Sequence, residues 1–209
     1  MIGSASANGN FGAGVRLTIP ATTQAGDLLI AVAGTNGSPS SWTTPTGWTA
    51  GTGGGHPDGQ GLNWWWKIAT SVDAGATVTL KASAYADGGG VVLDYRGASA
   101  TPIQAVSALT TNDNFGNGRV TSAQFAGASW SGSANVVSLL LMSWQPANAT
   151  VTWPSGYSLQ ATANDGYGFV SVGANLTTQS VSSLPAQVAT LSASQATVPT
   201  LQLAIRVGP

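Results

Sequence analysis

The sequence is poor in the residues that carry most protein chemistry. It contains no cysteine, no glutamate and one histidine, and only 6% of its 209 residues are charged, against about 25% in an average soluble chain. Without cysteine there is no disulfide framework and no thiolate metal site, and one histidine leaves no ligand set for zinc. The 6 basic residues are scattered along the chain and cannot form a phosphate-binding stripe, so we expect no nucleic-acid partner.

Long hydrophobic runs are also missing. The longest, Leu139 to Met142 with two valines shortly before it, is far below the about 20 residues that cross a bilayer. The first residues, Met1 to Ser4, lack the charged and apolar regions of a signal peptide. We therefore expect a soluble protein with no membrane partner and no secretion signal of its own.

What the chain does contain favours strands. Hydrophobic residues make up 43% of the sequence, and Gly, Ser, Thr, Asn and Ala fill most of the rest, which suits strands joined by turns better than helices. About a dozen strand patterns follow one another with turn signals every 8–12 residues, which is typical of a sandwich or jelly roll. The expected strands are 11–19, 28–33, 62–68, 76–82, 91–96, 119–125, 135–144, 157–161, 167–174, 187–191 and 200–207.

One pattern occurs twice. An apolar strand beginning at Leu28 leads through a polar loop to Pro45 and Trp48, and one beginning at Val137 leads to Pro154 and Tyr157, about 110 residues later. We therefore expect an all-β, antiparallel β-sandwich of jelly-roll type, built by internal duplication as a single domain over residues 1–209. Repeat 1 spans about 11–100 and repeat 2 about 119–207. Each repeat needs the other to cover its apolar face, so the halves 1–100 and 110–209 are expected to unfold or aggregate when expressed separately.

Residues suited to catalysis or metal binding are few. His56 lies in a glycine-rich loop without a nucleophile motif and is interpreted as a surface residue. The loop Asn112-Asp113-Asn114 with Asn117 is rich in oxygen ligands but lacks the acidic residues of a calcium loop. Binding of a structural calcium ion is left as an open alternative. We expect no enzyme, no catalytic residue and no cofactor. Six aspartates are interpreted as turn residues because they adjoin Gly, Asn or Ala: Asp27, Asp58, Asp73, Asp87, Asp113 and Asp165.

Two further charged or turn segments are interpreted from local pattern. Asp87 to Gly90 is expected to form a turn before the strand that follows it. On that strand, Asp94 and Arg96 lie two residues apart and are expected to form a solvated ion pair on its outer face.

The tryptophans offer the one candidate contact surface. In the strand that carries three of them consecutively, Trp64 and Trp66 share the core face, whereas Asn63, Trp65 and Lys67 share the other. An outward tryptophan between polar neighbours can anchor a protein interface, stack on a sugar ring, or be buried under a loop or sheet edge. The three residues of the second face are the candidate interface or glycan contact.

The first repeat resembles a β-sandwich module of tailed-bacteriophage structural proteins, also found in some bacterial surface proteins. In such modules the pattern reads GDLL, P-x-GW, YK-x-A and a late Y-R-G, and here Trp66 stands where tyrosine is usual. The likeness is clearest over residues 26 to 99 and carries no family active site. The matching segments are Gly26 to Ala31, Thr44 to Thr49, Trp65 to Ala69, Ala76 to Leu80 and Val92 to Gly97.

The resemblance implies a virion component, a minor tail protein or a capsid decoration protein that acts in particle assembly or surface attachment. Such a protein is assembled in the host cytoplasm, and its partners are other virion proteins, with a homo-oligomer or symmetric assembly expected. The alternative is a carbohydrate-binding module for host-surface glycans. The scarcity of charge favours assembly, because a subunit held in a particle needs less charge repulsion to stay in solution.

Overall fold

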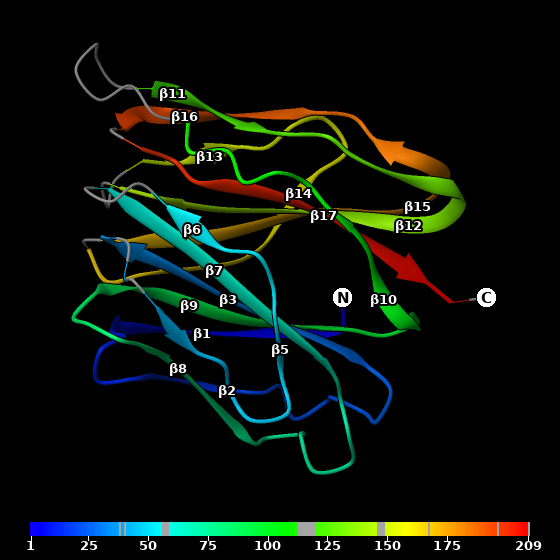
Figure 1. Cartoon of the computed structure of the whole chain (residues 1–209), viewed down its shortest axis with the longest axis horizontal. Coiled ribbons are helices and arrows are strands. Elements are labelled where there is room, and N and C mark those ends of the chain that lie inside the picture. Colours follow the sequence, from blue (N-terminus) through cyan, green and yellow to red (C-terminus); the bar gives the residue numbers. More distant parts are fainter. Residues whose placement is uncertain are drawn as a thin grey trace.

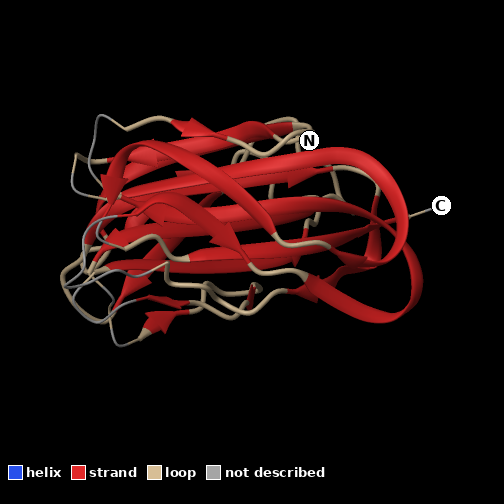
Figure 2. Ribbon diagram, turned by 90° about the horizontal axis from the view of Figure 1, so that it is seen from above, coloured by secondary structure: helices blue, strands red, loops and turns tan. Residues whose placement is uncertain are grey.

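The computed structural model describes residues 1–37, 39, 41–55, 59–112, 120–145, 149–166, 168–195 and 197–208. Every regular element among them is a β-strand (Figure 2), so the all-β prediction is confirmed. Within these same ranges, no helix is long and apolar enough to cross a membrane.

The strands divide between the two halves of the sequence. The first half contains β1 (Gly3–Asn10), β2 (Val15–Thr18), β3 (Leu28–Asn36), β4 (Trp42–Thr43), β5 (Thr49–Ala50), β6 (Gly54–Gly55), β7 (Gln60–Ile68), β8 (Thr77–Ala82) and β9 (Asp87–Tyr95). The second half contains β10 (Ala98–Val106), β11 (Val120–Phe125), β12 (Ala128–Trp144), β13 (Val151–Thr152), β14 (Ser158–Asn164), β15 (Phe169–Leu184), β16 (Gln187–Gln195) and β17 (Thr200–Val207).

These strands form four antiparallel sheets. The first inner sheet has the order β1-β9-β3-β7-β5, with β6 also paired to β7, and the second inner sheet has the order β10-β17-β12-β15-β14. The first outer sheet is β2-β8-β4 and the second outer sheet is β11-β16-β13. The prediction of antiparallel, sandwich-like sheets is therefore confirmed, although the molecule has more than the two layers of one simple sandwich.

The sheets are stacked as four layers, with the inner sheets face to face and one outer sheet on each side (Figure 1). Of four apolar clusters, the three largest fill the spaces between the layers. The central core joins the two inner sheets, with residues such as Leu93 and Leu139 fully buried, and draws on both halves of the chain. Each outer sheet packs on its own inner sheet through a second core, centred on Leu80 in the first half and on Phe125 in the second.

Because both inner sheets are covered on both sides, their middle strands are buried along almost their whole length. In β3 every residue from Leu28 to Thr35 is buried. Residues on one face of that strand, such as Ile30, enter the central core, and those on the other, such as Leu29, enter the first-half core. This is why the strand reads as a continuous apolar run and not as an alternation.

The expected turn at Asp87 to Gly90 is wrong, because these residues begin β9. One of these glycines, Gly89, lies where the second half of the chain comes close. A Cβ atom on Gly89 would lie 2.5 Å from the backbone carbonyl carbon of Ala163 on β14, and one on Gly34 would lie 2.9 Å from that of Phe169 on β15. Glycine permits this close approach of two backbones, and a side chain would force the sheets apart.

Several strand boundaries also differ from expectation. The segment Gly3–Asn10 forms an edge strand whose small polar residues gave no strand signal, and the strand expected over 11–19 is confined to Val15–Thr18. In the second half, β12 and β15 extend well beyond the expected 135–144 and 167–174 and pair as a long ribbon. The ribbon carries serine, threonine and one half-buried tryptophan, Trp130, and lacks the apolar pattern by which strands were recognised.

Candidate functional site

Trp65 does not form an exposed contact surface. It is 2% exposed and lies in the core between the first inner and first outer sheets. Its ring centroid is 5.3 Å from that of Trp42, which in turn lies 5.2 Å from that of Phe11. The alternation of β7 was interpreted correctly as two faces, but the second face is covered by another sheet and not by solvent. Of the three alternatives for this residue, burial is the one observed.

Its two polar neighbours have structural contacts. Lys67 forms an ion pair with Asp73, with 2.8 Å between Nζ and Oδ1. The same carboxylate accepts hydrogen bonds from the backbone N–H and the hydroxyl of Thr70 and so closes the turn after β7. Burial would raise the pKa of Asp73, but the hydrogen bonds from Lys67 and Thr70 outweigh it, and the pKa is lowered. Asn63 is half-buried near Gly53, so the three candidate residues do not share an exposed surface.

The expected solvated pair of Asp94 and Arg96 is also wrong. Arg96 binds Asp27 instead through two contacts, Nε to Oδ1 at 3.0 Å and Nη2 to Oδ2 at 2.9 Å. Asp94 is fully buried, because its face of β9 is covered by the first outer sheet and the turn before β3, and it accepts a hydrogen bond from Thr23. The hydrogen bond from Arg96 lowers the pKa of Asp27, whereas burial raises the pKa of Asp94.

The turn interpretation is confirmed for Asp27, Asp73 and Asp165 and is wrong for Asp87, which begins β9. Asp27 accepts a hydrogen bond from the backbone N–H of Gln24, and Asp165 accepts one from that of Gly168. In the oxygen-rich loop, Asn112 has a positive φ of 44° and its side chain binds the backbone of Gln124. Within the described ranges no group of three or more His, Cys, Asp or Glu is arranged to hold a metal. The residues His56, Asp58, Asp113, Asn114 and Asn117 lie outside the described residues.

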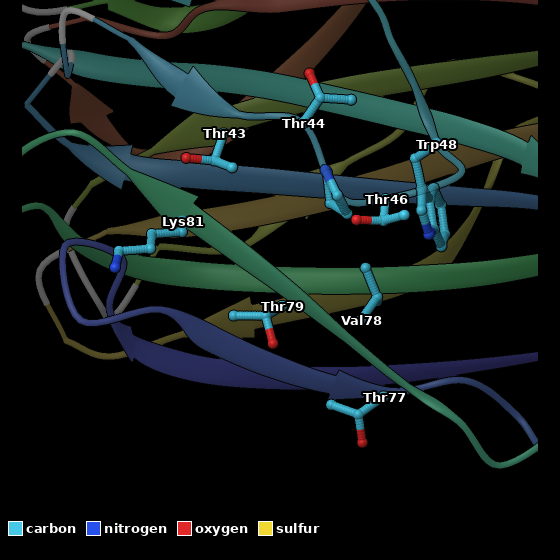
Figure 3. A pocket seen from close by; sticks show the side chains of 9 residues that line it. Thr43, Thr44, Thr46, Trp48, Thr77, Val78, Thr79 and Lys81 are labelled. Atoms are coloured by element: carbon cyan, nitrogen blue, oxygen red, sulfur yellow. The ribbon is translucent and has the colours of Figure 1, made fainter.

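A groove on the first outer sheet is the best candidate for a binding site (Figure 3). It has a volume of about 400 Å³, within the range of small-ligand sites. Lys81 lies at one end, and Trp48 lies at the other beside Thr46 (Figure 3). The groove is lined by Thr43, Thr44, Pro45, Thr46, Trp48, Thr77, Val78, Thr79 and Lys81.

Two local features build this groove. The alternation of β8 directs Val78 and Leu80 into the core and leaves Thr77, Thr79 and Lys81 exposed on the outer face. The opposite wall is the turn between β4 and β5, closed by a 3.0 Å hydrogen bond from the Trp48 backbone N–H to the Pro45 carbonyl. This turn needs the positive φ of 78° that glycine adopts at position 47.

A second hollow, of about 350 Å³, lies in the second half and has a different character. Aromatic and aliphatic residues dominate its wall, among them Trp144, Trp153, Leu159 and Phe169, and none of the described residues that line it is charged. It is smaller and less polar than the groove on the first outer sheet, which alone of the two combines hydroxyls, an aromatic ring and a cation.

The groove was not foreseen from the sequence. The pattern of β8 was visible, since valine and leucine alternate there with threonine and lysine. What the pattern did not reveal was the position of the turn that carries Trp48, because that turn comes from another part of the chain. In the structure Trp48 is half-buried, so part of its ring packs on the core and part remains accessible.

Comparison of the chain with protein-family models, with curated proteins and with solved structures found no match. Its function therefore has to be inferred from the residues and from their geometry.

Proposed function

We propose that this chain is a non-enzymatic structural protein of a tailed-bacteriophage particle, a minor tail protein or a capsid decoration protein acting in assembly or surface attachment. The observation that carries the proposal is the four-layer stack, in which both faces of both inner sheets are used for packing. Such a stack is a stiff body whose outer faces are free to contact neighbours. Its low charge suits a subunit held permanently among other virion proteins, as a homo-oligomer or in a symmetric assembly.

The fixed ionic groups support a scaffold in preference to a catalyst. Asp27 with Arg96, and Asp73 with Lys67, hold the turns at the ends of β3 and β7, and none of these four residues lines the groove. Catalysis of hydrolysis needs a positioned nucleophile or a pair of carboxylates facing a substrate. Turnover on polysaccharide or peptidoglycan that is lost when an aspartate or His56 is replaced by alanine would contradict this part of the proposal.

We also propose that each half is a jelly roll and that the two arose by duplication of one unit. In support, the halves contain strands of matching order in the chain and in the sheets. The correspondence is β1 with β10, β2 with β11, β3 with β12, β4 with β13, β5 with β14, β7 with β15, β8 with β16 and β9 with β17. Each half then has eight equivalent strands in two facing sheets, as in a jelly roll. The two units would form one domain through their shared central core.

A second candidate function is a carbohydrate-binding module for host-surface glycans. Burial of Trp65 removes the residue on which this alternative first rested. The groove beside Trp48 favours it again, because an accessible indole next to several hydroxyls can stack on a sugar ring and bind its polar groups.

The assembly proposal is tested by locating the protein on purified particles by electron microscopy with a gold-labelled antibody. Label at one fixed position on each particle is expected, and that position also distinguishes head from tail. Particles from a strain in which the gene is deleted serve as the control for antibody specificity. Purified particles that carry no label would refute the assembly role.

A further inference from the structure

We propose that the groove on the first outer sheet binds an acidic saccharide, a chain of sugar rings that carry carboxylate or phosphate groups. The inference rests on the glycan-binding alternative and is independent of whether the protein is part of a particle. It names the class of glycan and the residues that select it.

The groove lies on a sheet whose two charged residues are both cationic. Lys81 lines it, and Arg16 on β2 pairs in register with Thr79, which lines the groove from β8. Both cationic side chains are exposed, and among the described residues neither has an ion-pair partner. Neither the three strands of this sheet nor the turn 44–48 contains an acidic residue. A molecule with a net charge of −1 thus presents a local surface of charge opposite to its own.

The hydroxyls of the groove are available to a ligand. Five threonines line it, and within the described ranges their hydroxyls make no hydrogen bond to the protein. Each hydroxyl can donate one hydrogen bond and accept two, which matches the hydroxyls of a sugar. By contrast, the buried hydroxyl of Thr23 donates a hydrogen bond to Asp94.

Trp48 supplies a flat apolar surface in a fixed position. Its backbone is held by the turn that Pro45 begins, and its side chain packs against the first-half core beneath the groove. A ring held in this way stacks on the apolar face of a sugar without losing much conformational freedom. Figure 3 shows the indole at the end of the groove opposite Lys81, so a saccharide stacked on Trp48 would extend along the threonines toward the cation.

The second half provides an internal comparison. On the first outer sheet Thr43 pairs with Lys81, and on the second outer sheet Thr152 pairs with Thr190, so Thr190 is the counterpart of Lys81. Likewise, Arg16 pairs with Thr79 on the first outer sheet and Gln124 pairs with Val188 on the second, so Gln124 is the counterpart of Arg16. The same backbone positions therefore hold Gln124 and Thr190 in place of the two cations. Because the second half folds without charges at these positions, the fold does not require Arg16 and Lys81, and a ligand explains them.

The test is binding to defined oligosaccharides, measured by isothermal titration calorimetry. Tetragalacturonate is the carboxylate probe, a phosphorylated tetrasaccharide is the phosphate probe, maltotetraose is the neutral probe, and inorganic phosphate is the probe for charge without a sugar ring. We expect at least one acidic saccharide to bind more tightly than maltotetraose and more tightly than inorganic phosphate. Affinity should fall as salt rises, because the charges are exposed and screened.

Variants that copy the second half connect binding to the site. An exposed ion pair contributes up to about 1 kcal/mol, so Lys81→Thr and Arg16→Gln should each weaken binding of the acidic saccharide by up to about five-fold. The matched control is the double variant Lys81→Thr with Thr190→Lys, which restores the net charge at the equivalent position of the other half. It should bind as weakly as Lys81→Thr alone.

Three results would overturn the inference: no binding of either acidic probe at millimolar concentration, equal binding of acidic and neutral probes, or native affinity in the charge-restored double variant. All substituted residues are exposed, so unchanged circular dichroism and unfolding midpoints are expected for every variant. Failure here would leave the assembly role intact, because that role is judged by the presence of the protein on particles.

Discussion

Replacing Trp65 by alanine distinguishes a core tryptophan from a contact residue. The side chain is 2% exposed and packs against Trp42 between two sheets, whose backbones are held by their own hydrogen bonds and cannot close fully around a cavity. Loss of a buried aromatic side chain costs about 3–5 kcal/mol, and the lost ring contact belongs to this total. We expect Trp65→Ala to lower the free energy of unfolding by that amount.

The assay is equilibrium unfolding in urea, followed by far-UV circular dichroism so that the removed tryptophan does not bias the signal. Val72→Ala is the control, because that valine is 78% exposed and its loss should change stability by no more than about 0.5 kcal/mol. A loss below about 1 kcal/mol for Trp65→Ala, with the fold intact, would refute the buried position of this residue.

The second half suggests a compensating change. Gly173 is the counterpart of Trp65, because it pairs with Leu140 on β12 where Trp65 pairs with Ala31 on β3. The ring of Trp153 occupies the space above Gly173. The counterpart of Trp153 in the repeated turn is Thr44. We therefore expect Trp65→Gly to be partly rescued by Thr44→Trp. A double variant no more stable than Trp65→Gly would show that the two halves do not fill this space in equivalent ways.

Three further predictions concern the contact between the halves and the buried carboxyl groups. Gly89→Ala should destabilise the protein by about 1–3 kcal/mol in urea unfolding, since the Cβ of the new alanine would overlap the backbone of Ala163. A variant as stable as the native protein would contradict the close approach of β9 and β14. The pKa of Asp73 is lowered in the folded state, so its stabilising contribution is present above the unfolded value of about 3.9 and is lost as pH falls through the lowered pKa. Asp73→Asn should therefore cost stability at pH 7, and this cost should shrink as the native carboxylate becomes protonated. The pKa of Asp94 is raised, so its charged carboxylate lowers the free energy of unfolding instead of raising it. Asp94→Asn should therefore be more stable than the native protein at pH 7. This gain should vanish as pH falls and the native carboxyl becomes protonated. A pH-independent difference for either asparagine variant, measured by thermal unfolding across this range, would argue against the assigned environments.

Sequence patterns predicted the strands that carry apolar residues and missed those that do not. The repeated strand at Leu28 and Val137 was evident, because buried strands of central sheets are continuous apolar runs. The edge strand Gly3–Asn10 is joined to β9 by backbone hydrogen bonds, and the ends of β12 and β15 are joined to each other in the same way. Side-chain periodicity does not report such bonds.

The candidate site shows the same limit. Alternation along β7 correctly separates Trp64 from Trp65, but it does not tell whether the second face meets solvent or another sheet. For β8, by contrast, the exposed set with Thr79 and Lys81 could be read from alternation alone. Its meeting with Trp48 depends on how a turn from another part of the chain folds over the sheet, which is a tertiary feature that local pattern does not encode.

Whether the two halves fold as one unit can be measured on the intact chain by differential scanning calorimetry. The central core takes side chains from both halves, so melting of one half would expose the inner face of the other. We predict a single transition in which the calorimetric enthalpy equals the van't Hoff enthalpy, as expected for one cooperative unit. Two transitions, or a calorimetric enthalpy about twice the van't Hoff value, would show that the halves unfold independently and would contradict a shared core as the basis of the fold.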